Sequence, residues 1–188
     1  MHSKTYSKIE EYELLELAKA GKQFAYSEIM RRFENKVAGT VFGMLGKTQE
    51  AEDVCQNVFI RFFKSMEQFR GDSAMGTYIT RIAINLSLNE IKKNSKRSFF
   101  DLESIFKKNK SDFIEQSKIH SLEGKEIVQA ALNKLEPKFR SVIVLRIIDG
   151  YSTKETAEIL DTPVGTVLSR LSRAQEKLKT ILTPLMEE

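Results

Sequence analysis

The chain has 188 residues, of which 41% are hydrophobic and 30% charged, a balance typical of a globular protein with one domain or two small ones. Its formal net charge of +4 fits a nucleic-acid partner on one face without requiring one. The single cysteine, Cys55, excludes an internal disulfide and a cysteine-based zinc site. The sequence shows neither a membrane-spanning apolar run nor a signal-peptide core, so we expect a cytoplasmic protein. We expect neither a metal nor a cofactor.

The spacing of apolar residues predicts an all-α protein made of two small helical domains. Three- and four-residue steps recur along the chain, and alternating strand patterns are scarce. We expect the first domain over residues 8–94 and the second over residues 121–188. Between them, residues 95–120 are rich in lysine, serine and asparagine and lose the periodicity, which predicts a flexible linker.

The first domain is expected to contain four helices. A short helix ends at Gly21, and a second covers residues 23–45. The third covers residues 48–69 and is the clearest helix of the chain. The turn FRGDS, residues 69–73, then leads into a fourth helix over residues 74–93.

The third helix has an apolar face and a polar face. The apolar face follows the three-four step through Ala51, Val54, Cys55, Val58, Phe59, Phe62, Phe63 and Met66. The polar face carries Asp53, Gln56, Asn57 and Arg61. By pattern alone, this polar face is either an ordinary solvated surface or a protein interface. Cys55 lies on the apolar face, so we expect a core residue and not a redox group.

The second domain is also expected to contain four helices, of which the last two form a helix-turn-helix pair. Gly150 is suited to end the second helix of this domain. Ser152 and Glu155 have the spacing of a capping box at the start of the third. Pro163 is suited to the first position of the last helix, which we expect to end near residue 182.

The last helix is amphipathic. Its inner stripe is predicted to consist of Val164, Val167, Leu171, Ala174 and Leu178. Its outer side carries Thr166, Ser169, Arg173 and Lys177, with Arg170 on the flank. In a helix-turn-helix unit such a helix enters the DNA major groove, where arginine donates two hydrogen bonds to guanine. The same pattern is also compatible with an amphipathic surface helix whose cations are merely solvated.

Two longer stretches resemble conserved regions of bacterial sigma factors. Residues 51–91, AEDVCQNVFIRFFKSMEQFRGDSAMGTYITRIAINLSLNEI, are similar to the second region. Residues 135–178, LEPKFRSVIVLRIIDGYSTKETAEILDTPVGTVLSRLSRAQEKL, are similar to the fourth region. Their order and spacing, together with the length of the chain, resemble the extracytoplasmic-function (ECF) group of the sigma-70 family, which keeps only these two domains.

This resemblance implies a sigma factor that binds core RNA polymerase and directs promoter-specific transcription initiation. The polar face of the third helix, formed by Asp53, Gln56, Asn57 and Arg61, would bind the clamp helices of the polymerase core. The FRGDS turn and the helix after it would open the minus-ten element and hold a flipped base. Extruding a base from the duplex costs free energy, which stacking and edge contacts in a pocket can offset. The candidate pocket residues are Phe69, Gly71, Ser73 and Ala74, and Asn85 offers a donor and an acceptor nearby. Phe69 is equally suited to a plain core contact.

The resemblance also places the Pro163 helix in the major groove of the minus-thirty-five element. Ser169, Arg170 and Arg173 match positions that touch bases or phosphates in the family, and Arg146 matches an arginine that contacts the DNA backbone. Thr166 and Lys177 share the outer side of this helix, so the candidate site includes them. Family membership also makes an anti-sigma factor a plausible partner.

Four residues depart from the family pattern. Leu168 stands where arginine or lysine is frequent, so it is either half buried or placed to meet a thymine methyl group. Asn57 replaces a common glutamate, and Tyr78 a common tryptophan. Gly76 replaces a larger residue and weakens the start of its helix by about 1 kcal/mol relative to alanine. These departures affect the expectation of which promoter sequence is recognised more than the expectation of a sigma factor.

Other functions remain to be weighed against a sigma factor. A dimeric helix-turn-helix regulator that does not associate with core polymerase would share the second domain but would leave the first unexplained. A purely structural helical protein would show no salt-dependent DNA affinity. We expect no enzyme, because the two histidines, His2 and His120, lie in the N-terminal end and the linker, and no phosphate-cradling glycine loop is present.

Overall fold

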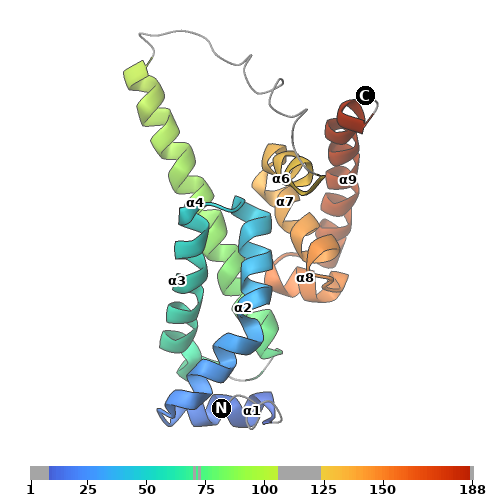
Figure 1. Ribbon diagram of the computed structural model, residues 1–188. Helices are drawn as coiled ribbons and strands as arrows, with labels where there is room; N and C mark the ends of the chain where they lie inside the picture. Colours follow the sequence, from blue (N-terminus) through green and yellow to red (C-terminus); the bar gives the residue numbers. More distant parts are fainter. Residues whose placement is uncertain (1–8, 70, 72, 106–123, 187–188) are drawn as a thin grey trace.

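The computed structural model describes residues 9–69, 71, 73–105 and 124–186, and every regular element within these ranges is a helix, as the sequence predicts (Figure 1). The first group of helices contains α1 (Glu11–Lys19), α2 (Gln23–Leu45), α3 (Gln49–Ser65), the short 3₁₀ helix η1 (Met66–Gln68) and α4 (Met75–Ile105). The second group contains α6 (Gly124–Lys134), α7 (Pro137–Ile143), the π-helical turn η2 (Val144–Ile148), α8 (Thr153–Ile159) and α9 (Val164–Met186).

Local sequence signals set several helix ends. The backbone of Gly46 adopts a φ of 77°, which favours glycine, directly after the last residue of α2. The Thr48 side chain accepts a hydrogen bond from the amide of Ala51 and so caps the start of α3. Ser152 and Glu155 form the predicted capping box at the start of α8. Because these signals act within a few residues, the sequence predicts them well.

Two helices are longer than the spacing of apolar residues predicts. α4 continues to Ile105, so the first part of the predicted linker is helical. Residues 94–105 contain no glycine or proline, and without either breaker the helix continues after its apolar face ends. α9 continues past Pro184 to Met186, beyond the expected end near residue 182. The remainder of the predicted linker, including His120, lies outside the described residues, as does His2.

The first group surrounds one apolar core. The buried face predicted for α3 lies in it, together with residues of α1, α2 and α4. Among the most deeply buried side chains of this core are Leu14, Leu15, Ile29, Val37, Val41, Val58, Phe62 and Ile79. α3 and α4 lie side by side against α2, which leaves one side of α3 exposed (Figure 1).

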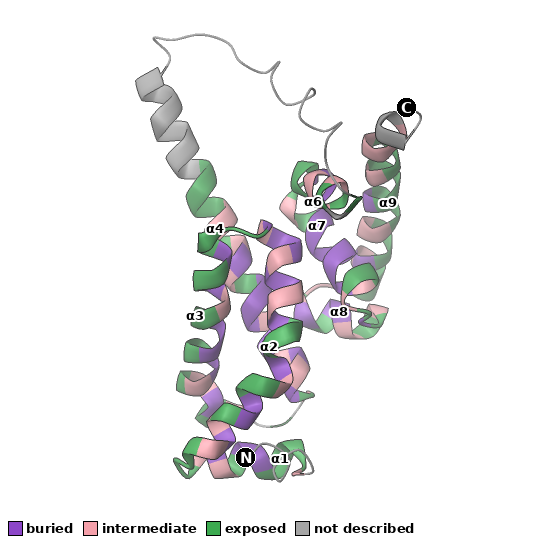
Figure 2. Ribbon diagram, in the orientation of Figure 1, coloured by how far each residue is buried: buried purple, intermediate pink, exposed green. Residues whose placement is uncertain are grey.

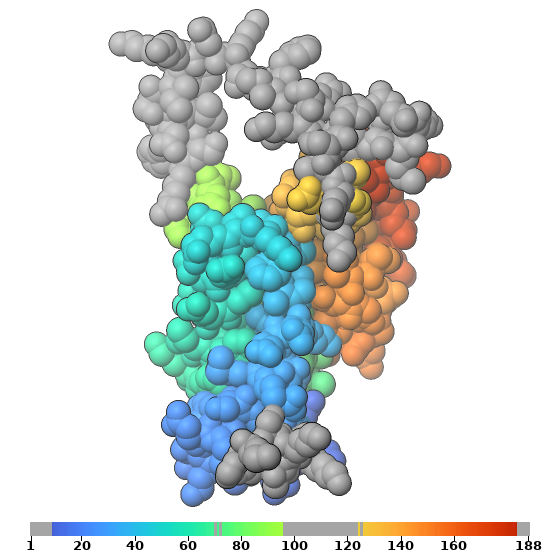
Figure 3. All heavy atoms as spheres, in the orientation of Figure 1, coloured from blue at the N-terminus to red at the C-terminus, as the bar shows by residue number. Residues whose placement is uncertain are grey.

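The two groups pack directly against each other. Met44 and Ile84 from the first group form one buried cluster with Val144, Leu145, Tyr151 and Ile159 from the second. Figure 2 shows buried residues on the facing sides of α2 and α7, and Figure 3 shows the two groups in contact. Polar contacts accompany this cluster: the hydroxyl groups of Thr80 and Tyr151 lie 2.7 Å apart, and Arg81 donates to the carbonyl oxygen of Glu158. The two groups therefore share an interface with a buried core.

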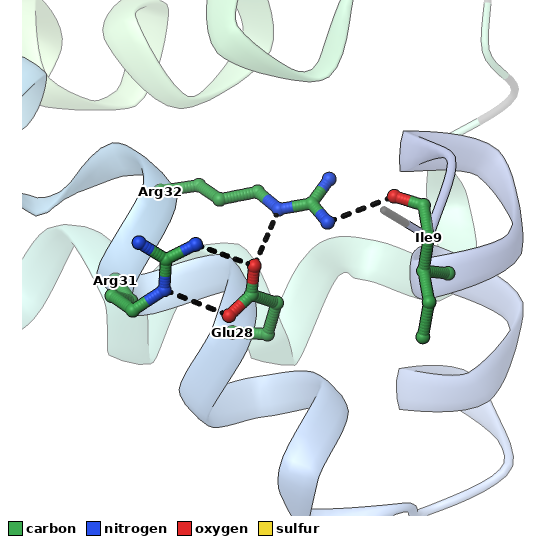
Figure 4. A network of polar contacts seen from close by, with 4 residues as sticks. All are labelled: Ile9, Glu28, Arg31 and Arg32. Atoms are coloured by element: carbon green, nitrogen blue, oxygen red, sulfur yellow. Dashed lines mark hydrogen bonds and ion pairs between the residues drawn. The ribbon is translucent and has the colours of Figure 1, made fainter. Parts of the chain in front are cut away.

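A charged network fixes the N-terminal segment to α2 (Figure 4). Glu28 is buried and accepts two hydrogen bonds from Arg31, at 2.8 and 2.7 Å, and one from Arg32 at 2.9 Å. Arg32 also donates to the carbonyl oxygen of Ile9 at 2.8 Å. The hydrogen bonds from Arg31 are the main reason that the pKa of Glu28 falls to about 2, although burial opposes this shift.

Candidate polymerase and nucleic-acid interfaces

The predicted polar face of α3 is exposed along its length. Asp53, Gln56, Asn57 and Arg61 are all exposed, and helical spacing places them on one side of α3. The opposite side is anchored by Val54, Val58 and Phe62 in the core. Because the core fixes the rotation of α3, these four polar side chains are presented together to a partner.

A groove between α3 and α4 extends this polar face. It has a volume of about 370 Å³ and is lined by Val54, Asn57, Ile60, Arg61, Lys64, Leu86, Asn89, Glu90 and Lys93. Ile60 is 51% exposed, although it is a large apolar residue. The groove therefore combines an apolar floor with amide groups and several cations, a composition suited to a protein partner.

Sequence reasoning missed the contribution of Ile60, Asn89 and Lys93 to this groove. A signal for Ile60 existed, because it is apolar and lies between polar positions of α3 instead of on the inner stripe. Asn89 and Lys93 lie on α4, and only the packing of α3 against α4 brings them next to Asn57 and Arg61.

The turn between η1 and α4 keeps the four predicted pocket residues close together. Phe69 is half-buried, and its ring centroid lies 5.0 Å from that of Tyr78. Gly71 has a φ of 77°, a backbone conformation that favours glycine and that reverses the chain here. Ala74 is exposed and Ser73 half-buried at the start of α4. Phe69 thus both packs on the core and leaves part of its ring at the surface.

The structure separates Asn85 from this turn. Asn85 is exposed and lies eleven positions after Ala74, about 16 Å further along α4 at 1.5 Å per residue. Asn85 therefore lies apart from the turn that holds Phe69 and Ser73, and its contact with the minus-ten element stays a prediction.

Packing explains two of the departures from the family pattern. A Cβ atom at Gly76 would lie 3.2 Å from the ring of Phe33, which is closer than side chains normally pack, so the close approach of α2 favours glycine there. Tyr78 donates a hydrogen bond of 3.0 Å to the Ser65 hydroxyl at the end of α3. This bond fixes the tyrosine ring beside Phe69.

α9 presents most of the predicted DNA-contacting side chains. Val167 and Ala174 are fully buried and hold the helix against the rest of the second group. Ser169, Arg173 and Lys177 are exposed, and Thr166 and Arg170 are half-buried. The Ser169 hydroxyl donates to the carbonyl oxygen of Thr166 at 3.0 Å. Ser169 and Arg173, one turn apart, form the centre of the exposed face.

Three positions around this face differ from the sequence expectation or refine it. Val164, predicted on the inner stripe, is 45% exposed, because the first turn of α9 lies at the edge of the packed surface. Leu168 is 52% exposed, which decides against its burial. Lys177 lies 3.7 Å from a carboxylate oxygen of Glu136, so this cation already has an acidic partner.

Arg146 is half-buried, as are Thr166 and Arg170 among the candidate DNA contacts. It lies in the π-helical turn η2 and donates a hydrogen bond to the carbonyl oxygen of Tyr151. This bond ties the guanidinium to the loop that begins the helix-turn-helix pair. Arg146 therefore has a structural role whether or not it also contacts a phosphate.

The titratable groups of the described part of the chain differ from the arrangements that hold metal ions. No cluster of histidine, cysteine, aspartate and glutamate there is arranged to hold a metal ion. Burial raises the pKa of the half-buried Cys55 thiol, which lowers its thiolate fraction. Across residues 9–69, 71, 73–105 and 124–186, no helix is sufficiently long and apolar to cross a bilayer.

Each of the two groups of helices matches a known family model. Residues 29–97 match Sigma-70 region 2, and residues 125–178 match Sigma-70, region 4. The chain is 34% identical over 175 residues to the ECF RNA polymerase sigma factor SigW of Bacillus subtilis, covering 89% of this chain and 94% of SigW. It is 33% identical over 181 residues to the ECF RNA polymerase sigma-E factor of Escherichia coli K12, covering 92% of this chain and 94% of that protein.

The fold is also similar to that of two solved structures. The sigma factor RpoE of Bartonella quintana, in complex with the anti-sigma factor NepR, superposes with a TM-score of 0.66 at 23% identity and covers 84% of this chain and 96% of its own. CnrH, in complex with the cytosolic domain of CnrY, gives a TM-score of 0.65 at 23% identity and covers 91% of this chain and 96% of its own. Because sequence similarity extends over nearly the whole chain and both regions match in order, the protein belongs to the sigma-70 family, in its ECF group of RNA polymerase sigma factors.

Proposed function

We propose that this protein is a non-catalytic initiation factor that binds core RNA polymerase and directs it to a set of promoters. The observation that carries the proposal is the match of regions 2 and 4 in one chain, whose relatives are named as ECF RNA polymerase sigma factors. A DNA-binding regulator without polymerase would need region 4 only. Copurification with core polymerase, followed by transcription from selected promoter DNA, tests the proposal.

The α3 face and the α3–α4 groove bind the polymerase core in this proposal. Asp53, Gln56 and Asn57 make polar contacts, and Ile60 supplies an apolar contact at the centre. A double variant, Asp53→Ala with Gln56→Ala, should weaken core binding while changing the free energy of unfolding by less than about 0.5 kcal/mol per residue, because both side chains are exposed. Asn35→Ala, at an exposed position of α2, is the matched control. If the double variant binds core polymerase with unchanged affinity, this face is not the polymerase-binding surface.

The turn after η1 and the start of α4 open the minus-ten element. Phe69 offers a partly exposed ring for stacking, and Ser73 offers a hydroxyl group a few residues away. Phe69→Ala should slow promoter opening more than it lowers binding to duplex DNA. 2-Aminopurine fluorescence in the minus-ten element measures opening separately from binding.

α9 reads the minus-thirty-five element, with Arg173 as the main base contact. Arg173 is exposed opposite the buried Val167, so its guanidinium can reach base edges. Arg173→Ala should reduce the binding free energy by about 1–3 kcal/mol on the preferred promoter and by less on other promoters. Lys177→Ala should weaken binding to all DNA sequences about equally. It should lower the slope of log binding constant against log salt concentration by less than one, because Glu136 already neutralises part of the charge of Lys177. Both measurements require the holoenzyme.

The two groups must separate for both promoter elements to be bound at once. The elements lie about 25 base pairs apart, which is about 85 Å at 3.4 Å per base pair. A compact chain of this length has a radius of gyration of only about 16 Å. The packed arrangement and the promoter-bound arrangement therefore exclude each other, and contacts such as that of Thr80 with Tyr151 break on promoter binding.

An anti-sigma factor is the third expected partner. Two solved proteins with this fold were determined with an anti-sigma factor or with the cytosolic domain of another protein. A partner that binds and stabilises the packed arrangement would prevent promoter binding for the reason just given.

A further inference from the structure

Two aliphatic side chains lie exposed on the helix that carries the DNA-contacting residues. Val164 is 45% and Leu168 52% exposed, and they are four positions apart in α9, so they lie on the same side of the helix. No apolar cluster within the described residues includes either of them, whereas Val167 and Leu171 pack into the second group. Folding alone does not account for two adjacent exposed apolar residues here.

The position of this pair around the helix relates it to the polar face. At 100° per residue, Leu168 lies about 100° from Ser169 and about 140° from Arg173 around the axis of α9. Thr166 and Arg170 lie on the opposite flank. When Ser169 and Arg173 point at the base edges, Leu168 therefore borders one side of the contact. Val164, about 140° from Ser169 and 180° from Arg173, lies further round the helix and flanks Leu168 near the N-terminal end.

The major groove presents one apolar group among its polar base edges, which is the C5-methyl group of thymine. An aliphatic side chain placed against that methyl group buries apolar surface on both partners. The same side chain placed against the amino group of cytosine removes water from a hydrogen-bond donor without replacing it. Leu168 can therefore distinguish thymine from cytosine without a hydrogen bond.

We propose that Leu168, supported by Val164 one turn earlier, reads the C5-methyl group of a thymine in the minus-thirty-five element. This inference rests on the proposed function of α9 as the helix that enters the major groove. With leucine at position 168, the helix recognises at least one thymine, whereas a cation at that position would favour guanine or a phosphate.

Replacing thymine with deoxyuridine tests the inference, because it removes only the methyl group. The upstream element is first selected from random duplex DNA with the wild-type holoenzyme. Each thymine of the selected element is then replaced singly by deoxyuridine, and holoenzyme binding is measured for wild type, Leu168→Ala and Arg173→Ala. Alanine is a strong helix former, and Leu168 is exposed, so Leu168→Ala should fold normally.

At one thymine, deoxyuridine should lower wild-type binding about fourfold, the factor expected from one buried methyl group. The Leu168→Ala variant should bind both duplexes equally, whereas Arg173→Ala should bind more weakly but keep the fourfold difference. Val164→Ala should reduce the difference in part.

The inference is overturned if no thymine of the selected element responds, or if wild type and Leu168→Ala lose binding equally. A loss of core polymerase binding in Leu168→Ala would also overturn it, because the pair would then be a protein contact. Failure of the proposed function has a different signature: the holoenzyme selects no element, or Arg173→Ala leaves binding unchanged.

Discussion

The Thr40 hydroxyl donates a hydrogen bond of 2.7 Å to Asp149 Oδ2 and so joins α2 to the end of η2 across the interface between the two groups. Thr40 is fully buried and Asp149 is half-buried. Burial raises the pKa of Asp149 from 3.8 to about 6, and the Thr40 hydrogen bond and the charge of Lys36 only partly oppose this shift. The interface thus contains an acid that is more easily protonated than in water.

The raised pKa of Asp149 predicts that acid stabilises the packed arrangement. Because the packed state binds the proton more tightly than the unfolded state, the contribution of this group to stability is fully present below pH 3.8 and is lost as the pH rises through about 6. Asp149→Asn should therefore raise the free energy of unfolding at pH 7.5 by about 1 kcal/mol, after allowing for partial solvent access. Urea unfolding at pH 5.0 and 7.5 measures this, with Asp53→Asn, at an exposed position, as the control. Equal pH dependence in wild type and Asp149→Asn would contradict it.

Gly43 is predicted to be required for the close approach of the two groups. A Cβ atom at this position would lie 3.0 and 3.2 Å from the methyl groups of Val144, which is fully buried. Gly43→Ala should destabilise the protein by about 1 kcal/mol, although alanine favours the helix. At Gly39, the Cβ would meet only Asp149 Oδ1 at 3.7 Å, so Gly39→Ala should be neutral or stabilising. Thermal unfolding of the two variants side by side tests the difference, and similar midpoints would refute it.

Arg140 is predicted to be more important for stability than any exposed arginine. It is 8% exposed and donates to the carbonyl oxygens of Met44, Asn133 and Leu135, which lie near the C-terminal ends of α2 and α6. A lysine cannot span these acceptors, so Arg140→Lys should lower the free energy of unfolding by about 2–3 kcal/mol. Arg61→Lys, at an exposed site, should change it by less than about 0.5 kcal/mol. Denaturant titration distinguishes these values, and a loss below about 0.5 kcal/mol for Arg140→Lys would disprove the assignment.

Glu28 is predicted to stabilise the N-terminal segment in a pH-dependent way. Its pKa is lowered from 4.5 to about 2, so its contribution is present above pH 4.5 and is lost as the pH falls towards 2. Glu28→Gln should lower the free energy of unfolding at pH 7 by about 1–2 kcal/mol, and the difference from wild type should fade in acid. Hydrogen exchange of α1 should increase at the same time, because the Glu28–Arg32–Ile9 connection is broken. Glu13→Gln, at an exposed position of α1, is the control; if it has the same effect, the network is not the cause.

Local sequence determined the helices and much of the two faces that are proposed to bind polymerase and DNA. The ends of α2 and α8 follow from Gly46 and from the Ser152–Glu155 capping box, because a helix end depends on residues within one turn. The exposed sides of α3 and α9 follow from helical periodicity, which fixes Asp53 or Arg173 opposite the apolar stripe once that stripe is buried.

Only the tertiary structure decided which surfaces meet. Val164 shares the periodicity of the inner stripe, yet its exposure depends on where the packed surface ends. Asn85 lies about 16 Å further along α4 than Ala74, a separation that its residue type alone does not indicate. Arg140 gives no sign of burial in the sequence, because its three acceptors are carbonyl oxygens, and carbonyl oxygens are present at every residue. Helix limits depend on neighbours in sequence, whereas burial and the α2–α7 interface depend on contacts between residues far apart in the chain, which periodicity does not specify.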